Sequence, residues 1–141
     1  MVNKKIVTIF LLLFLITSTI SCVYADDDDR SYSITQALVD IIVDTNGMLH
    51  INETFDYSFD GTFNGVYRDI PLKEGESISN IHVSAEGAYT KVEQHQEDGT
   101  QHIKIYLYSD AAKTQPISDT NVKVHISYDM KNVVTVYQDT A

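Results

Sequence analysis

The sequence predicts an all-β fold, an antiparallel β-sandwich of about six to seven strands that is immunoglobulin-like in architecture. Tyrosine, valine, isoleucine and threonine are frequent, and turn-forming residues interrupt the chain at short intervals. Apolar and polar residues alternate over several segments, and no segment keeps the periodicity of an amphipathic helix. Period-two alternation of β-branched and aromatic residues is typical of strands that bury one face. We expect one such domain over residues 31–141.

The first expected hairpin turns at Thr45-Asn46-Gly47. Before the turn, residues 38–44 (LVDIIVD) carry apolar side chains at both parities, which predicts a strand covered on both faces. After the turn, the odd-numbered positions are mostly apolar and the even-numbered ones are polar. The odd apolar positions are Leu49, Ile51, Phe55, Tyr57 and Phe59.

The register of this hairpin depends on the length of its loop. A three-residue loop with Gly47 in the left-handed conformation pairs Val43 with Leu49 and matches apolar side chains, whereas a two-residue loop pairs them with polar ones. We therefore expect the three-residue loop. It places Glu53 opposite Val39, on an otherwise apolar face.

A second hairpin is expected over residues 88–108, with a two-residue turn at Asp98-Gly99. This turn pairs Val92 with Ile105 and sets His95 opposite His102. Further strands are expected over residues 77–85 and 121–129, and residues 133–137 are a last β-prone run. The core positions on these segments are Ile103, Ile105, Leu107, Val122, Val124, Ile126 and Tyr128.

Residues 60–76 (DGTFNGVYRDIPLKEGE) are interpreted as a corner, because glycines permit positive φ and Pro71 removes a hydrogen-bond donor. Phe59, Phe63 and Tyr67 are expected to close the end of the sandwich. Arg68 has two interpretations. It is either a staple that holds loop carbonyls, Asp69 or a more distant carboxylate, or a site that captures an anionic ligand.

The run Gly65-Val66-Tyr67-Arg68-Asp69-Ile70-Pro71, placed after the hairpin VDIIVDTNGMLHINETFDYSF, resembles a family of predicted membrane proteins of archaea and bacteria. Their extracytoplasmic part is known as domain of unknown function 2207. The segments IKIYLYSD and ISYDMKNVVTVYQD are similar as well, so the resemblance covers residues 31–141. It implies an extracytoplasmic β-domain normally followed by more β-structure, a membrane span and a cytoplasmic tail. It brings no catalytic residues, and this chain is expected to be truncated at its C-terminus.

The N-terminus has the three parts of a secretory signal peptide over residues 1–25: Lys4 and Lys5, an apolar run over residues 6–20, and small residues before a cleavage site between Ala25 and Asp26. Two alternatives stay open, namely lipidation of Cys22 and an uncleaved signal anchor. The four aspartates that follow, with Arg30, form an acidic tether over residues 26–30.

Charge and cysteine content exclude several functions. Cleavage after Ala25 leaves 8 basic and 20 acidic side chains, and hence a net charge of −12. Nucleic acid is therefore not an expected partner. Cys22 leaves with the signal, so stability must come from a packed core rather than a disulfide. No cofactor is expected, and no nucleophile elbow or phosphate-binding glycine loop indicates catalysis.

Three further groups of residues are candidate sites. Tyr106 and Tyr108 share a strand face that could stack on sugars, with filling against Tyr89 as the alternative. His95 and His102 could share a metal ion, with two exposed polar side chains near a hairpin tip as the alternative. Asn52 begins the glycosylation sequon Asn52-Glu53-Thr54.

The sequence thus predicts a non-enzymatic module of a membrane or cell-surface protein, secreted or held at the extracytoplasmic face of the membrane. Its expected partners are envelope or membrane proteins or its own missing C-terminal region, with a signal anchor or a downstream span as the link to the membrane. The alternative is a carbohydrate- or metal-binding accessory domain of a secreted enzyme. Because a missing strand leaves an open sheet edge, the isolated chain is expected to associate, in a state that the sequence does not specify.

Overall fold

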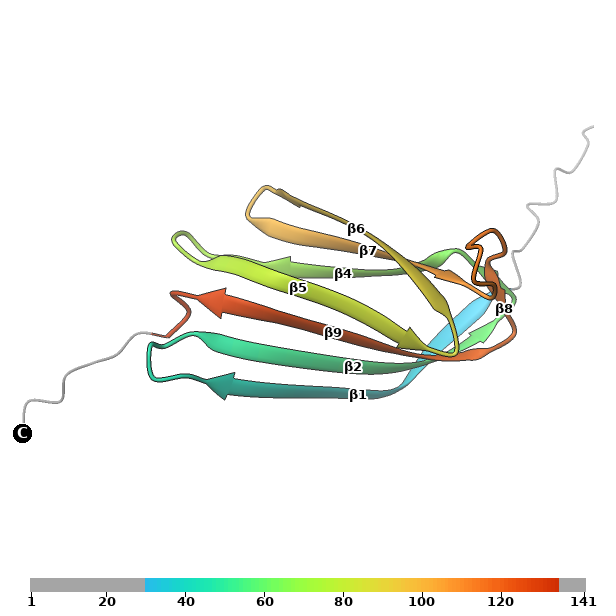
Figure 1. Ribbon diagram of the computed structural model, residues 1–141, viewed down its shortest axis with the longest axis horizontal. Helices are drawn as coiled ribbons and strands as arrows, with labels where there is room; N and C mark the ends of the chain where they lie inside the picture. The colour runs from blue at the N-terminus through green and yellow to red at the C-terminus, as the bar shows by residue number, and fades with distance from the viewer. Residues whose placement is uncertain (1–29, 135–141) are drawn as a thin grey trace, which may run out of the picture.

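The computed structural model describes residues 30–134, and this part of the chain forms nine strands and no helix (Figure 1). The strands are β1 (Ser31–Val43), β2 (Leu49–Asp60), β3 (Thr62–Phe63), β4 (Gly65–Pro71), β5 (Ser77–Glu86), β6 (Tyr89–Glu97), β7 (Thr100–Tyr108), β8 (Ile117–Ser118) and β9 (Asn121–Lys131). All strand pairs are antiparallel. The predicted all-β antiparallel fold is therefore confirmed.

Two sheets form the sandwich. The four-stranded sheet has the order β1-β2-β9-β5, and the three-stranded sheet has the order β4-β7-β6. The short strands β3 and β8 pair with each other at one end, where β2 leads into β4 (Figure 1). Among the described strands, β1 and β4 thus form the edges on one side of the molecule, and β5 and β6 form the edges on the other.

The core lies between the sheets and follows the alternation in the sequence. Side chains on β7 and β9 are buried at every second position, because successive side chains of a strand point to opposite faces. The predicted core positions are all buried: Ile103, Ile105, Leu107, Val122, Val124, Ile126 and Tyr128. Phe59 and Phe63 close one end, with ring centroids 5.0 Å apart.

Both hairpin registers agree with the sequence. Val43 pairs with Leu49, and the backbone N–H of Asp44 bonds to the carbonyl of Met48, so the loop has three residues. Gly47 has φ 78°, the left-handed conformation that this loop requires. The second hairpin is also paired as expected. Its pairs include Tyr89 with Tyr108, Val92 with Ile105, Glu93 with Lys104, and His95 with His102.

The interpretation of residues 60–76 as a corner was wrong for its central part. Residues 65–71 form the edge strand β4, which pairs with β7 along its whole length. Gly65 permits this pairing, because a Cβ there would lie 2.0 Å from the carbonyl oxygen of Ile105. Tyr67 does not close the end of the sandwich. Since it alternates with inward-facing Val66 and Arg68, it lies on the outer face and is 67% exposed.

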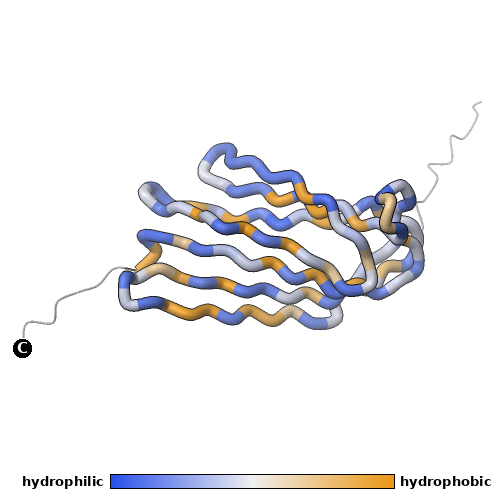
Figure 2. The backbone as a smooth tube through the Cα atoms, viewed as in Figure 1, coloured by the Kyte–Doolittle hydropathy of each residue, from blue (hydrophilic) through white to orange (hydrophobic). Residues whose placement is uncertain are grey.

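The expectation that residues 38–44 are covered on both faces was also wrong. All 13 residues of β1 are exposed, because no described strand of the three-stranded sheet lies opposite it. Figure 2 shows β1 as the lowest strand, hydrophobic over much of its length and open to one side. Apolar side chains at both parities therefore mark an uncovered edge strand here, not a buried one.

The ends of the chain carry several predictions that the structure does not describe. The signal segment, Cys22, the cleavage site at Ala25 and Asp26, and the four aspartates lie outside the described residues, as do residues 135–141. Of the β-prone run at 133–137, Val133 and Val134 are described, and neither belongs to a strand. Arg30, the last residue of the expected tether, donates a hydrogen bond to the carbonyl of Thr62 at 3.1 Å.

Candidate interaction surface and site residues

Arg68 is joined to Glu53 across the two sheets. The guanidinium donates from Nε to Oε2 of Glu53 at 2.7 Å and from Nη2 to Oε1 at 2.6 Å. The hydroxyl of Tyr128 donates to the same Oε1 at 3.0 Å. Glu53 is only 3% exposed, so its charge is removed from water and depends on these three donors.

The cluster acts as a staple between strands. Arg68 stands on β4 of the three-stranded sheet, whereas Glu53 and Tyr128 stand on β2 and β9 of the four-stranded sheet. The hydrogen bond to Glu53 raises the pKa of Arg68, and burial together with the charge of Glu53 raises the pKa of Tyr128 to about 12. Arg68 Nη1 also donates to the backbone carbonyl of Asp69 at 2.8 Å. The arginine is thus engaged by a distant carboxylate, while 34% of its side chain stays exposed.

The other residues near Arg68 point away from it. Asp69 lies on the outer face of β4 and contacts His102 Nδ1 at 2.9 Å. His102 stacks on His95 with ring centroids 4.9 Å apart and an angle of 22° between the planes. Stacked imidazoles do not direct their nitrogens at one point between them. Within residues 30–134, no group of three or more histidine, cysteine, aspartate or glutamate side chains is arranged to hold a metal ion.

Tyr106 and Tyr108 lie where the sequence places them, on the outer face of the three-stranded sheet. Their rings are 6.5 Å apart and 20° from parallel. Lys104 Nζ lies over both Tyr106 and Tyr67, 4.5 and 5.5 Å from their ring centroids. Hydrogen bonding with Tyr106, and then with Tyr67, raises the pKa of Lys104. This face therefore combines aromatic rings with a cation that covers part of them.

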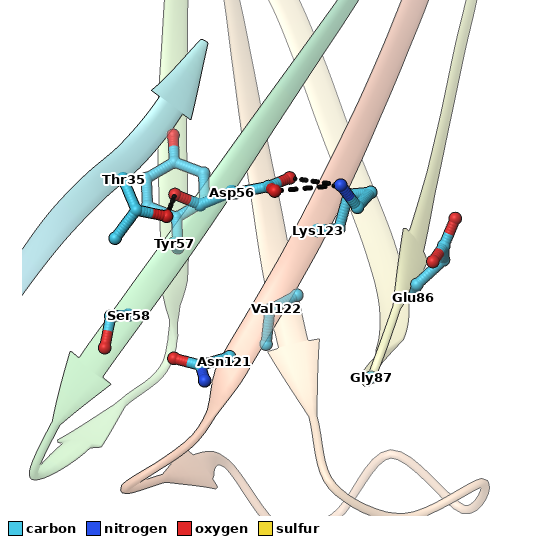
Figure 3. A pocket seen from close by; sticks show the side chains of 9 residues that line it. All are labelled: Thr35, Asp56, Tyr57, Ser58, Glu86, Gly87, Asn121, Val122 and Lys123. Carbon is cyan, nitrogen blue, oxygen red and sulfur yellow. Dashed lines mark hydrogen bonds and ion pairs between the residues drawn. The ribbon is translucent and has the colours of Figure 1, made fainter.

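The outer face of the four-stranded sheet is polar over β2 and β9, whereas β1 exposes Leu38 and Ile42 there. Figure 3 shows an open hollow on this face, where Asp56 and Lys123 pair across β2 and β9 with atoms 2.7 Å apart. Thr54 Oγ1 lies 3.1 Å from Nδ1 of His125 on the same face. Asn52, the sequon residue, is exposed there. Whether Asn52 is modified stays a prediction.

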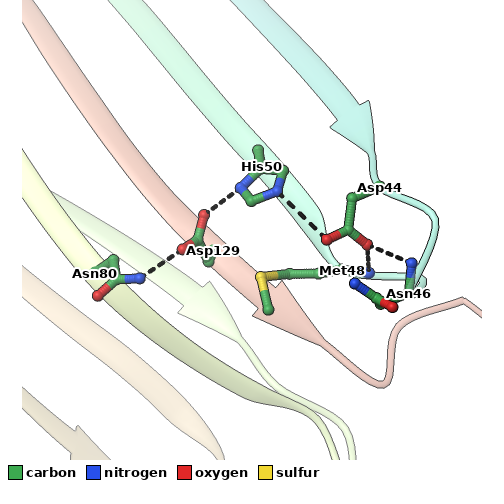
Figure 4. Close-up of polar contacts among 6 residues, drawn as sticks. All are labelled: Asp44, Asn46, Met48, His50, Asn80 and Asp129. Carbon is green, nitrogen blue, oxygen red and sulfur yellow. Dashed lines mark hydrogen bonds and ion pairs between the residues drawn. The ribbon is translucent and has the colours of Figure 1, made fainter.

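A chain of polar contacts on this face secures the first hairpin. Figure 4 shows His50 between Asp129, at 2.7 Å, and Asp44, at 3.8 Å. Asp44 Oδ1 also accepts hydrogen bonds from the backbone N–H groups of Asn46 and Met48. These bonds lower the pKa of Asp44, chiefly the bond from Met48. Asn80 donates to Asp129 at 2.6 Å and is the main cause of the lowered pKa of Asp129.

These lowered pKa values predict how stability changes with acid. A carboxyl with a lower pKa in the folded chain binds fewer protons than in the unfolded chain, so protonation favours unfolding. The stabilisation is present above the unfolded-state pKa, about pH 4, and is lost as the pH falls toward the lower folded-state pKa. We expect the melting temperature to fall as the pH drops below about 4 and to fall less in Asp44→Asn. Thermal melts followed by circular dichroism measure this, and equal slopes in both proteins would contradict it.

Strand β1 carries a surface that the sequence did not predict. Its large apolar side chains that point toward the core layer are each 48–60% exposed. This inner stripe consists of Tyr32, Ile34, Val39, Ile41 and Val43. A β-bulge between Ile34 and Gln36 keeps Tyr32 and Ile34 on the same face as Val39. The signal for this surface was in the sequence, as apolar residues at both parities, but it was interpreted as burial.

An aromatic pocket opens beside the inner stripe. It has a volume of about 290 Å³ and lies between β1, β2 and β4. Tyr57 and Phe59 form its floor, with ring centroids 5.5 Å apart, and Tyr32 lies over Phe63 edge-on at 5.9 Å. Burial raises the pKa of Tyr57. The pocket and the inner stripe form one continuous apolar surface on the side of the molecule bounded by β1 and β4.

A family profile matches most of the chain. The profile described as "Predicted membrane protein (DUF2207) N-terminal domain" matches residues 33–141. No curated protein and no solved structure matches this chain. Within residues 30–134, no helix is long and apolar enough to cross a membrane.

Proposed function

The chain belongs to this family of predicted membrane proteins, since the family profile covers residues 33–141, and from that premise we propose that its β-sandwich is a non-enzymatic extracytoplasmic module that binds other polypeptides. The observation that carries the proposal is the inner stripe of β1. Five apolar side chains in one row are each about half exposed or more. Soluble domains rarely leave such a patch in water unless it is a contact surface.

The strand that bears the stripe is suited to binding a polypeptide. As an edge strand, β1 offers backbone N–H and C=O groups along one side, and a second polypeptide can bond to them. Its side chains supply apolar contact on the adjoining face. Backbone pairing gives affinity, and the aromatic pocket gives specificity for the side chain that enters it.

Two further observations support a binding role outside the cytoplasm. The N-terminal segment, with two lysines before an apolar run, is of the secretory type. The buried ionisable cluster, formed by Glu53, Arg68 and Tyr128, is closed on itself, because each oxygen of Glu53 already accepts a hydrogen bond. Such a cluster is suited to holding strands together rather than to transferring protons to a substrate.

A photo-reactive side chain placed on β1 tests the proposal in cells. At Ile41 it is expected to form covalent adducts with polypeptide in native membranes, whereas at Gln94, on β6 of the opposite edge, it is not. A membrane-impermeant maleimide is expected to label Glu97→Cys in whole cells but not the parent chain, which controls for Cys22. No polypeptide adduct at Ile41, or labelling of Glu97→Cys only after lysis, would overturn the proposal.

Carbohydrate binding is a second candidate function. The near-parallel rings of Tyr106 and Tyr108 favour it, because sugars stack on such rings. Lys104 opposes it, since its ammonium group lies over Tyr106 and occupies one ring face. The two functions use different sheets. Binding of a sugar would survive a substitution on β1, whereas binding of a polypeptide would not.

A further inference from the structure

On the side of the sandwich bounded by β1 and β4, the four-stranded sheet extends one strand further than the three-stranded sheet. The four-stranded sheet ends at β1, and the three-stranded sheet ends at β4. Arg68 on β4 reaches Glu53 on β2, so β4 lies over β2 and not over β1. The inner stripe therefore faces the position that one more strand of the three-stranded sheet would occupy. Among the described residues, no strand fills that position, and the side chains of the stripe stay 48–60% exposed.

We infer that a second copy of this chain fills this position, with β1 of each copy lying beside β4 of the other. The two inner stripes then pack face to face in the centre of the pair. This inference rests on the proposed function and names its partner. It explains the uneven sheets, because a four-stranded and a three-stranded edge complement each other when two copies meet.

A two-fold axis parallel to the strands generates the pair. Rotation about this axis carries the four-stranded sheet of one copy into the layer of the three-stranded sheet of the other. Each layer then contains β5-β9-β2-β1 of one copy followed by β4-β7-β6 of its partner. The arrows of β1 and β4 point the same way in Figure 1, and the rotation preserves strand direction, so the two strands meet in parallel. The arrangement uses the β1 and β4 edges of each copy, and its two-fold symmetry closes this contact at two copies.

The chemistry of the inner stripe fits contact with itself. An axis parallel to the strands places each residue of the stripe opposite the same residue of the partner, so Ile41 meets Ile41 and Val39 meets Val39. Every member of the stripe is uncharged, and therefore no like charges face each other. Glu53, which lies opposite Val39 of the stripe, is already paired with Arg68 within each copy. Asp40, in contrast, lies on the opposite face of β1, since it pairs with outward-facing Asn52.

The aromatic pocket lies on the same seam. Its walls include Tyr32 and Ile34 of the inner stripe, and Val66 and Tyr67 at the edge of β4. In the two-fold pair the same end of the partner's stripe lies opposite this pocket, so apolar side chains from the second copy can enter it. Both parts of the continuous apolar surface are thereby covered by one contact.

Sedimentation of the chain after removal of residues 1–25 tests the inference. We expect a dimer at micromolar concentration. Ile41→Lys places two ammonium groups face to face and is expected to raise the dissociation constant of the dimer by at least about 100-fold, in favour of monomer. Tyr89→Lys, at an exposed position on β6, is the matched control and keeps the dimer. Circular dichroism verifies that both variants are folded, which is expected because both positions are exposed.

Cross-linking tests the symmetry. Without residues 1–25 the chain has no cysteine, so a single added cysteine reports only contacts between copies. Ile41→Cys is expected to give a covalent dimer with a bis-maleimide that spans about 10 Å, the usual separation of packed sheets. Leu38→Cys, on the other face of β1, is expected to give little. A monomer at all concentrations, a dimer that Ile41→Lys leaves intact, or equal cross-linking at both positions would overturn the inference.

The failure of this inference and of the proposed function are distinguishable. If the purified chain is monomeric while Ile41 forms adducts with a different polypeptide in membranes, the self-contact is wrong and the polypeptide-binding function stands. If Ile41 forms no adduct with any polypeptide in membranes and the purified chain is monomeric, both are wrong.

Discussion

Replacing Arg68 by alanine is expected to lower the free energy of unfolding by about 3–5 kcal/mol, because it leaves a buried carboxylate without its partner. Glu53 is 3% exposed, and in the variant only the hydroxyl of Tyr128 would remain to donate to it. Arg68→Lys is expected to lose part of this energy, since one ammonium group cannot reproduce two parallel bonds to two oxygens. Urea denaturation followed by tyrosine fluorescence gives both values.

Two controls isolate the role of the buried charge. In the double variant Glu53→Leu with Arg68→Met, most of the lost stability is expected to return, because apolar side chains of similar volume remove both charges together. Lys123→Ala breaks the exposed pair with Asp56 and is expected to cost less than about 1 kcal/mol. If Arg68→Ala and Arg68→Lys both unfold at the wild-type urea concentration, Arg68 is not a staple.

Replacing Gly65 by alanine is expected to lower the free energy of unfolding by about 3 kcal/mol or more. The added Cβ would meet the backbone of β7, 2.0 Å from the carbonyl oxygen of Ile105 and 2.9 Å from Cα of Tyr106. Backbone atoms cannot turn aside as a side chain can, so β4 must move away from β7. Gly65 also has φ 155°, a conformation that residues with a Cβ rarely adopt.

Gly75→Ala is the matched control for this prediction. Gly75 also has a positive φ, 85°, but no atom lies within 4 Å of the position of its Cβ. Only the backbone preference is then lost, which is expected to cost about 1–2 kcal/mol. Calorimetric melting of both variants separates the two effects. A Gly65→Ala protein as stable as Gly75→Ala would show that β4 does not need its close approach to β7.

The parts of the fold that could be predicted are the hairpins, in which a short turn sets how two strands adjacent in sequence pair. The loop at Gly47 and the turn at Asp98-Gly99 fix which residues face each other, so both registers could be derived from matching apolar partners. The same register also predicts that Glu53 is an acidic residue on an apolar face, although it does not identify the partner of Glu53. Arg68 was recognised as a group able to hold a distant carboxylate, and the structure supplies that carboxylate from 15 positions away.

The parts that were missed depend on which strands lie opposite each other. Glycine and proline around β4 indicated a turn, because the sequence does not show that Gly65 lies against β7. The burial of β1 could not be derived either. The burial of β1 depends on the number of strands in the facing sheet. Apolar side chains at both parities occur both in a buried central strand and in an unpaired edge strand, so this pattern does not distinguish the two.

The place of β9 has a consequence for the way the chain acquires its structure. β9 is the last of the described strands in sequence, yet it lies in the middle of the four-stranded sheet, between β2 and β5. During synthesis the β1–β2 hairpin is the only pair of that sheet that can form before β9, and β5 has no neighbour within the sheet until residues 121–131 have emerged. The four-stranded sheet is therefore completed only after β9 has been synthesised, and until then β2 and β5 expose hydrophobic faces that favour aggregation.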